Sequence, residues 1–242
     1  MGGAGAEPLT LVSADGTRFS AALAPSPRPS PLGVLVLPDV RGLYGFYVEL
    51  TERFAAAGYP AVALDYFGRT AGPGRRGEGF DHQPHVAETR LGWIQEDAAA
   101  SLEALRERAG STAAVAVGFC FGGTHAFLAA TSAELDLQGV AGFYGGLDGS
   151  RRGLPSPPDV VEGMRCPVLG LFGGADAGIP VPAIERFDKR LSAADVDHEI
   201  VVYPGAPHSF FDRRQDQYAE ESRDAWRRVL GFLDRIAAGT EE

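Results

Sequence analysis

The sequence predicts an α/β fold with a mostly parallel central sheet flanked by helices on both faces. Short runs of consecutive apolar residues, such as GVLVL at 33–37, are typical of strands that are buried on both sides. These runs alternate with longer segments in which apolar residues recur at helical spacing, as they do at 46–57. Strands that are joined through helices indicate right-handed crossovers between parallel neighbours.

The individual elements follow from local patterns. Two strands at 9–12 and 19–23 flank an Asp15-Gly16 turn, which predicts an N-terminal antiparallel hairpin. Residues 65–85 are rich in Gly, Arg and His and are predicted to be irregular. The remaining strands are predicted at 33–37, 60–64, 113–117, 140–144, 166–172 and 198–203, and the helices at 46–57, 92–109, 121–131, 181–193 and 215–237.

The length and composition indicate one globular domain over residues 1–242. Apolar residues make up 45% of the chain and charged residues 22%, which is enough to bury a large core. There is no internal repeat and no long linker, and only the first roughly eight residues are expected to be disordered. No apolar run approaches the length of a membrane span.

The charge and the cysteine content limit the partners that we expect. A net charge of −10 argues against binding to nucleic acid or to an anionic membrane, although it leaves room for an anionic small molecule in a locally basic cleft. Two cysteines, Cys120 and Cys166, do not make a disulfide framework, and the N-terminus has no signal-peptide pattern. We therefore expect a cytoplasmic protein, a monomer or a homodimer, that acts on a small molecule.

Polar side chains follow four of the predicted strands, at the point where each strand ends. They are Asp39, Cys120, Asp176 and His208. In an open α/β sheet, ligands bind at the carboxyl ends of the strands, so these residues are the first candidates for a functional site.

The segment VGFCFGG at 117–123 has the pattern of a nucleophile elbow. Gly118-x-Cys120-x-Gly122 matches G-x-S-x-G with sulfur in place of oxygen. Such a turn is strained, and the residues on either side must lack side chains so that the backbones can approach closely. The N-terminus of the helix that follows would favour a negative charge on the sulfur. The alternative is a buried cysteine in a glycine turn, because free cysteines are often simply buried.

Each of the other candidates also has a structural interpretation. Asp176 could form a turn or an N-cap, His208 could be a packed loop residue, and Asp39 could cap the turn that follows it. The chain order of nucleophile, acid and histidine is nevertheless that of a catalytic triad in α/β-hydrolases. The combination is much more specific than any one of these residues.

The chain resembles the dienelactone hydrolase family of α/β-hydrolases in segments that span nearly its whole length in the family's order. The resemblance implies a single α/β-hydrolase domain that needs no cofactor and no metal, with a triad of Cys120, Asp176 and His208 that acts on an ester or enol-lactone. The matching segments are LPDVRGLYGFY (37–47), AGYPAVALDYFGR (57–69), VGFCFGGTHAFLAA (117–130), VAGFYGG (140–146), CPVLGLFGGAD (166–176) and YPGAPHSFF (203–211).

The resemblance also implies a mechanism. His208 would help to form the Cys120 thiolate, Asp176 would orient the imidazole, and the sulfur would attack the carbonyl to give an acyl-thioester that water hydrolyses. The backbone N–H groups of Phe121 and Val40 would stabilise the tetrahedral oxyanion.

Two features depart from the family pattern. The family usually has Glu where this chain has Asp39, so the acid that helps to activate the thiol is one methylene shorter here. The arginines that hold a substrate carboxylate in well-known members do not align directly. The candidates for that role are Arg213 and Arg214, with Arg75, Arg76, His82 and His85 in the 65–85 loop, and for each of them a solvated loop charge is the simpler interpretation.

Other functions stay open at this point. The same triad would serve a broad-specificity carboxylesterase or thioesterase, and a catalytically silent fold could use Cys120 for binding or redox sensing. A flavodoxin-like amidotransferase or DJ-1-type fold is disfavoured because it lacks an Asp and a His at two further strand ends. Cys166 and His125 are predicted to be structural.

Overall fold

The structure, a computed structural model, describes residues 5–149 and 153–239. The chain forms two compact units, Met1–Ala116 with Glu134–Asp136, and Val117–Ala133 with Leu137–Glu242. It passes from one to the other inside strand β5 (Ala113–Phe119). Part of the N-terminal segment expected to be disordered, residues 1–4, lies outside the described residues, whereas Glu7 and Pro8 already belong to a strand. The expectation of a single domain stays a prediction.

The first unit contains the antiparallel hairpin and the first parallel strands. Strands β1 (Glu7–Val12) and β2 (Arg18–Ala24) pair as predicted, and β2 is also antiparallel to β4 (Ala61–Leu64). Strand β3 (Leu32–Leu37) runs parallel to β4 and is buried along its whole length. The strand order in this unit is β1-β2-β4-β3-β5, with β5 contributing its residues up to Ala116.

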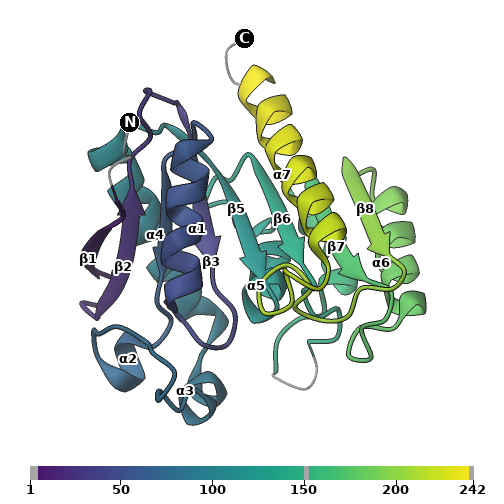
Figure 1. Cartoon of the computed structure of the whole chain (residues 1–242), viewed down its shortest axis with the longest axis horizontal. Coiled ribbons are helices and arrows are strands. Elements are labelled where there is room, and N and C mark those ends of the chain that lie inside the picture. The colour runs from purple at the N-terminus through teal and green to yellow at the C-terminus, as the bar shows by residue number, and fades with distance from the viewer. Residues whose placement is uncertain (1–4, 150–152, 240–242) are drawn as a thin grey trace. The chain divides into compact units, whose positions relative to one another are not determined.

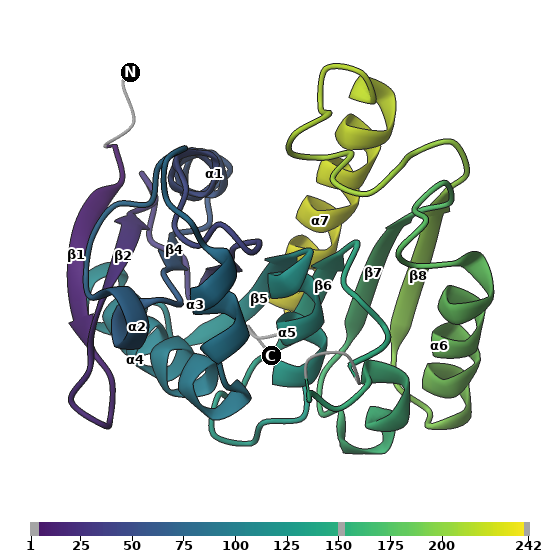
Figure 2. The ribbon, with the colours of Figure 1, turned by 90° about the horizontal axis from the view of Figure 1, so that it is seen from below.

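Two long helices cover the two faces of these strands. Helix α1 (Gly45–Ala56) lies on one face and α4 (Leu91–Ala109) on the other (Figures 1 and 2). The buried residues of α1 include Tyr47, Leu50 and Phe54, which recur at helical spacing. The sequence pattern therefore located both helices to within one or two residues.

The segment 65–85 is not wholly irregular, which corrects the sequence prediction. It contains the short helix α2 (Gly68–Ala71) and the start of α3 (Gln83–Glu88). Both are too short for a hydrophobic period to appear, and neither buries a residue. Arg69 of α2 is held instead by an ion pair of 2.8 Å to the buried Asp97 of α4, an interaction that no local pattern reveals.

The second unit continues with parallel strands in the order β5-β6-β7-β8, where β6 is Gly139–Phe143, β7 is Val168–Gly173 and β8 is His198–Tyr203. Helices α5 (Phe121–Ala129) and α6 (Val181–Ala193) lie on one face, and α7 (Ala219–Gly239) lies on the other (Figure 2). Two turns of 3-10 helix, η2 (Pro157–Asp159) and η3 (Val161–Gly163), lie in the connection from β6 to β7.

Two boundaries differ from the sequence prediction. Strand β7 begins at Val168 rather than at Cys166, because Pro167 has no N–H to donate to a neighbouring strand. Helix α7 begins at Ala219 rather than at 215, since the residues before it form turns.

Cys166 is buried, and burial raises the pKa of its thiol to about 12, which agrees with a structural role. In the described part of the chain, no helix combines the length and apolarity that a membrane span requires.

Together these elements confirm the predicted fold class, an α/β fold with a mostly parallel sheet and an N-terminal antiparallel hairpin.

In the second unit, a glycine on a strand allows an aromatic ring of a helix to pack closely against the sheet. A Cβ atom on Gly142 of β6 would lie 2.3 Å from the ring of Phe127. Phe127 of α5 is fully buried and meets Phe187 of α6 edge-on, with ring centroids 5.1 Å apart. Gly142 thus sets the spacing between α5 and the strands.

We expect Gly142→Ala to lower the free energy of unfolding by about 1–3 kcal/mol, because the added methyl overpacks against Phe127. Phe127→Leu in the same chain should restore part of the loss by making room. Urea unfolding followed by circular dichroism measures both. Gly231→Ala in α7 is the control, since its Cβ meets no atom within 4 Å and should be neutral or stabilising. An unchanged midpoint for Gly142→Ala would contradict the packing argument.

Candidate active site

Cys120 lies in a sharp turn between strand β5 and helix α5. A Cβ on Gly118 would lie 2.0 Å from the carbonyl oxygen of Gly122, so the backbones touch where the elbow pattern requires them to. A Cβ on Gly123 would lie 2.7 Å from the carbonyl oxygen of Phe143 in β6. These close approaches explain why a side chain is excluded on both sides of the cysteine.

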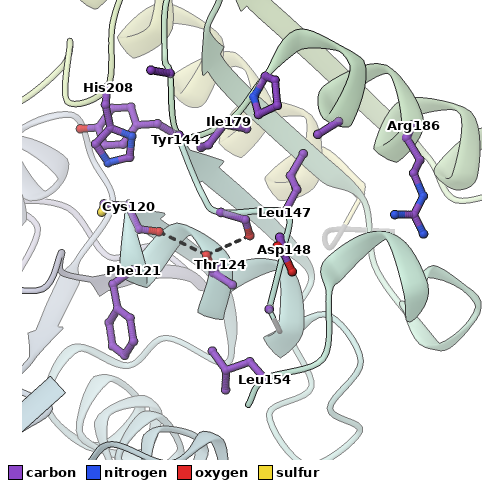
Figure 3. A pocket seen from close by; sticks show the side chains of 16 residues that line it. Cys120, Phe121, Thr124, Tyr144, Leu147, Asp148, Leu154, Ile179, Arg186 and His208 are labelled. Carbon is purple, nitrogen blue, oxygen red and sulfur yellow. Dashed lines mark hydrogen bonds between the residues drawn. The ribbon is translucent and has the colours of Figure 1, made fainter. Parts of the chain in front are cut away.

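The backbone of Cys120 is strained, and its neighbours hold it in place. Its φ of 53° and ψ of −111° are unfavourable for a residue with a side chain. Its N–H donates to the carbonyl of Phe143 (2.9 Å), and its own carbonyl accepts from the N–H of Thr124 (3.1 Å). The Thr124 hydroxyl donates to the carbonyl of Gly146 (3.0 Å; Figure 3). The turn is therefore anchored to the chain that leaves β6.

Asp176 and His208 come from the ends of the last two strands, β7 and β8, and meet directly. Asp176 follows β7 and His208 follows β8, and His208 Nδ1 lies 2.5 Å from Asp176 Oδ2. The other carboxylate oxygen of Asp176 accepts the N–H of Gly178 at 2.8 Å. The side chain therefore forms a turn with one oxygen and orients the histidine with the other.

The electrostatics favour charge on both members of this pair. Burial alone would raise the pKa of Asp176, but the hydrogen bond and the charge of His208 lower it below its usual value. Burial alone would lower the pKa of His208, yet Asp176 and the sulfur of Cys120 raise it to about 10. The imidazole is thus protonated at neutral pH and interacts with the carboxylate of Asp176 and with the sulfur of Cys120.

A cavity of about 660 Å³ opens in front of Cys120 and His208. Apolar side chains, among them Leu147, Leu154 and Ile179, form much of its wall (Figure 3). Its charged lining residues away from the triad are Asp148 and Arg186, within the described part of the chain. Arg186 also forms an exposed ion pair of 2.5 Å with Asp159. The site can hold a small, mainly apolar molecule against the sulfur.

Tyr144 is a site residue that the sequence analysis missed. It follows β6, has a φ of 37° and is fully buried. Its ring centroid lies 5.0 Å from that of His208, and its hydroxyl donates to Asp212 (3.4 Å). It therefore packs against the imidazole. The sequence analysis selected polar residues that directly follow a predicted strand. It did not select Tyr144 because the predicted strand, 140–144, included this residue.

Asp39 and Val40 lie in the first unit, in the loop after β3. Asp39 is fully buried and accepts the backbone N–H of Arg41 at 2.8 Å, so it does cap the turn that follows it. It also forms an ion pair of 2.7 Å with the guanidinium of Arg41. The roles expected for Asp39 and Val40 beside Cys120 stay predictions.

The residues suggested for binding a substrate carboxylate have varied surroundings. Arg76 is buried in an ion pair of 2.8 Å with Asp65, and His85 stacks on Phe80 with centroids 5.0 Å apart. Both of these side chains therefore pack within the first unit rather than project as solvated loop charges. Of the other candidates in the first unit, Arg75 is exposed and His82 is half-buried. Arg213 and Arg214 lie in the second unit, where both are exposed. Neither is among the described residues that line the Cys120 cavity.

His125 lies one turn into α5 and is buried, with its ring 4.4 Å from that of Phe121, edge-on. It packs within the helix, as expected. Among the residues that the structure describes, no three His, Cys, Asp or Glu side chains gather as metal ligands do.

The sequence model of the dienelactone hydrolase family matches residues 19–237. A protein of Yersinia pestis named "Putative carboxymethylenebutenolidase" is 32% identical over 213 residues, covering 83% of this chain and 76% of the relative. One of the same name from Saccharolobus solfataricus is 30% identical, covering 92% and 96%. A crystal structure of a "Putative Dienelactone Hydrolase" from Klebsiella pneumoniae superposes with a TM-score of 0.81 at 28% identity, covering 94% of this chain and 99% of that one.

The raised pKa of His208 can be tested by removing the charge of its partner. In Asp176→Asn we expect the pKa of His208 to fall below about 10, because only the sulfur of Cys120 then opposes the effect of burial. Imidazole NMR signals followed against pH measure this. Asp188→Asn is the matched control, since Asp188 pairs with a different histidine, His198. An unchanged His208 titration in Asp176→Asn would refute the assignment of the cause.

The strain at Cys120 predicts a gain in stability when the side chain is removed. Cys120→Gly should raise the free energy of unfolding by about 1–2 kcal/mol, because glycine adopts a positive φ without penalty. Cys166→Gly, at the buried cysteine, should lower the free energy of unfolding instead, because it leaves a cavity. Chemical unfolding of both variants gives the comparison, and a destabilised Cys120→Gly would show that the elbow stores no such strain.

Proposed function

The chain belongs to the dienelactone hydrolase family, and from that premise we propose that Cys120, His208 and Asp176 are the triad of a cysteine-dependent hydrolase. Its substrate is an enol-lactone of the dienelactone type or another small activated ester, and the reaction passes through an acyl-thioester. The observation that carries the proposal is the placement of His208, which is paired with buried Asp176 on one side and interacts with the Cys120 sulfur on the other.

In the first half of the reaction, the thiolate of Cys120 attacks the ester carbonyl. The C–S bond forms as the carbonyl π electrons move to oxygen. The developing oxyanion accepts a hydrogen bond from the N–H of Phe121, which opens α5. The N-terminal end of α5 adds a favourable field for this negative charge.

Collapse of the tetrahedral intermediate then breaks the ring C–O bond, and His208 gives its proton to the departing oxygen. An enolate is a good leaving group, so a thiolate can expel it without strong activation. In the second half, neutral His208 takes a proton from water as the water attacks the thioester. The thiolate departs, and the imidazolium–thiolate pair is restored. Asp176 keeps the imidazole oriented throughout.

The cavity is consistent with a small substrate. Its volume of about 660 Å³ and its apolar wall suit a compact ring or a short acyl chain. The name of the curated relatives denotes an enzyme that opens a lactone bearing a carboxylate. For such an anionic group we propose Arg186, which lines the cavity, whereas the sequence candidates Arg213 and Arg214 are not among the described lining residues.

A broad carboxylesterase or thioesterase is the second candidate, supported by the apolar side chains Leu147, Leu154 and Ile179 in the cavity wall, against which a neutral acyl chain could pack. The same triad serves both. A binding or redox role of a silent fold is disfavoured by the paired and protonated His208, which a non-catalytic cysteine does not need.

The proposed location is a reducing cytoplasm, with which the two free cysteines agree. The proposed form is a monomer or homodimer.

Replacement of the nucleophile tests the proposal. We expect Cys120→Ala to lower kcat/KM for p-nitrophenyl acetate and for cis- and trans-dienelactone by at least about 10³-fold. Cys120→Ser should retain a small residual rate, because a hydroxyl is a poorer nucleophile at the same position. Cys166→Ala, the matched control, should keep nearly the wild-type rate. Near-wild-type turnover by Cys120→Ala would disprove the nucleophile, and wild-type turnover of simple esters without dienelactones would favour the broad esterase.

A further inference from the structure

The side chain of Thr124 connects the first turn of α5 to the chain that leaves β6. Its hydroxyl lies 3.0 Å from the carbonyl oxygen of Gly146 and 3.5 Å from that of Cys120 (Figure 3). A threonine on a helix often bonds the carbonyl four residues before it, but here the shorter bond goes outside the helix, to Gly146. Thr124 is buried, although it also lines the cavity in front of the sulfur.

The two segments that this hydroxyl joins are packed backbone against backbone. A Cβ on Gly145 would lie 2.8 Å from the backbone nitrogen of Thr124, and a Cβ on Gly146 would lie 3.3 Å from its hydroxyl. A Cβ on Gly123 would lie 2.9 Å from the Cα atom of Gly145. The hydroxyl therefore has little room to leave the Gly146 carbonyl, and the bond between them reports the position of one segment to the other.

The peptide that joins Cys120 to Phe121 carries both the carbonyl that Thr124 contacts and the N–H that is proposed to bind the oxyanion. Because a trans peptide is planar, its carbonyl and its N–H point in opposite directions, so that holding one fixes the other. The N–H of Thr124 also donates to the Cys120 carbonyl at 3.1 Å, but this bond lies within the first turn and moves with it. The bond to Gly146 ties that turn to a point outside the helix.

We propose that Thr124 is a positioning residue that aims the Phe121 N–H at the oxyanion. The inference rests on the proposed function, in which this N–H stabilises the charge that forms when the Cys120 thiolate attacks. An oxyanion donor is effective only when it is already aimed at the position that the charge will occupy, because reorienting it during the reaction costs free energy. Thr124 acts through the peptide and needs no contact with the substrate. These residues and Gly146 all belong to the second unit.

Thr124→Val provides the test, since it deletes the hydroxyl and keeps the branched shape. We expect kcat for p-nitrophenyl acetate to fall about tenfold, part of the loss that follows removal of an entire donor, with KM changed less than twofold. Thr124→Ser, which keeps the hydroxyl, should recover most of the rate. The rate of Cys120 alkylation by iodoacetamide should stay unchanged in both variants, because that displacement needs the thiolate and forms no oxyanion.

Thr131→Val is the matched control. It deletes a threonine hydroxyl of the same unit, one that donates to the carbonyl of Leu128, and it should change neither turnover nor alkylation. Thr124→Ala removes the hydroxyl without placing a methyl against the Gly146 carbonyl. It should show the same split of kcat from KM as Thr124→Val, and urea midpoints check that each variant is folded in the assay.

Three outcomes would overturn the inference. They are an unchanged kcat in Thr124→Val and Thr124→Ala, a parallel loss of alkylation and turnover, which indicates a damaged thiolate, and a rise in KM at constant kcat, which indicates a substrate contact. A loss in Thr124→Ser as large as that in Thr124→Val would also contradict a role for the hydroxyl. Failure of the proposed function itself would appear separately, as turnover that survives Cys120→Ala.

Discussion

The contact between the backbones of Gly118 and Gly122 is the constraint on which the site depends. It brings the end of β5 against the first turn of α5, and the residue between them must then adopt a positive φ despite its side chain. The carbonyl of Phe143 and the hydroxyl of Thr124 keep that turn in place from the side of β6. A strained residue persists only where such surroundings over-determine it, and here the residue is the cysteine that carries the chemistry.

The pair of Asp176 and His208 shows how local charge overcomes burial. Burial acts against the charged form of each side chain, yet their mutual interaction favours both charges, and the sulfur of Cys120 adds to the effect on His208. One carboxylate oxygen of Asp176 accepts the N–H of Gly178 in its own turn, and the other pairs with His208. The same side-chain conformation therefore serves both the turn and the histidine. Tyr144 completes it by packing against the imidazole ring.

The first unit uses buried carboxylates in a different way. Asp39 and Asp65 each pair with an arginine and each accept backbone N–H groups of the same loop region. Buried ion pairs contribute little net stability, because desolvation offsets their attraction. Their effect here is on conformation: they allow the loop after β3 one arrangement.

By itself, the sequence determined the fold class, the strands and the triad candidates. Apolar runs and helical spacing are local patterns, so α6 and β8 could be bounded to the residue, and polar residues at strand ends could be selected because parallel strands end at one edge. The tertiary structure alone decided which charged side chains line the cavity, that Arg76 is buried, and that Tyr144 touches His208. Such partners lie far apart in the chain, and a loop arginine has the same local sequence signature whether it is solvated, buried in an ion pair or part of a binding site.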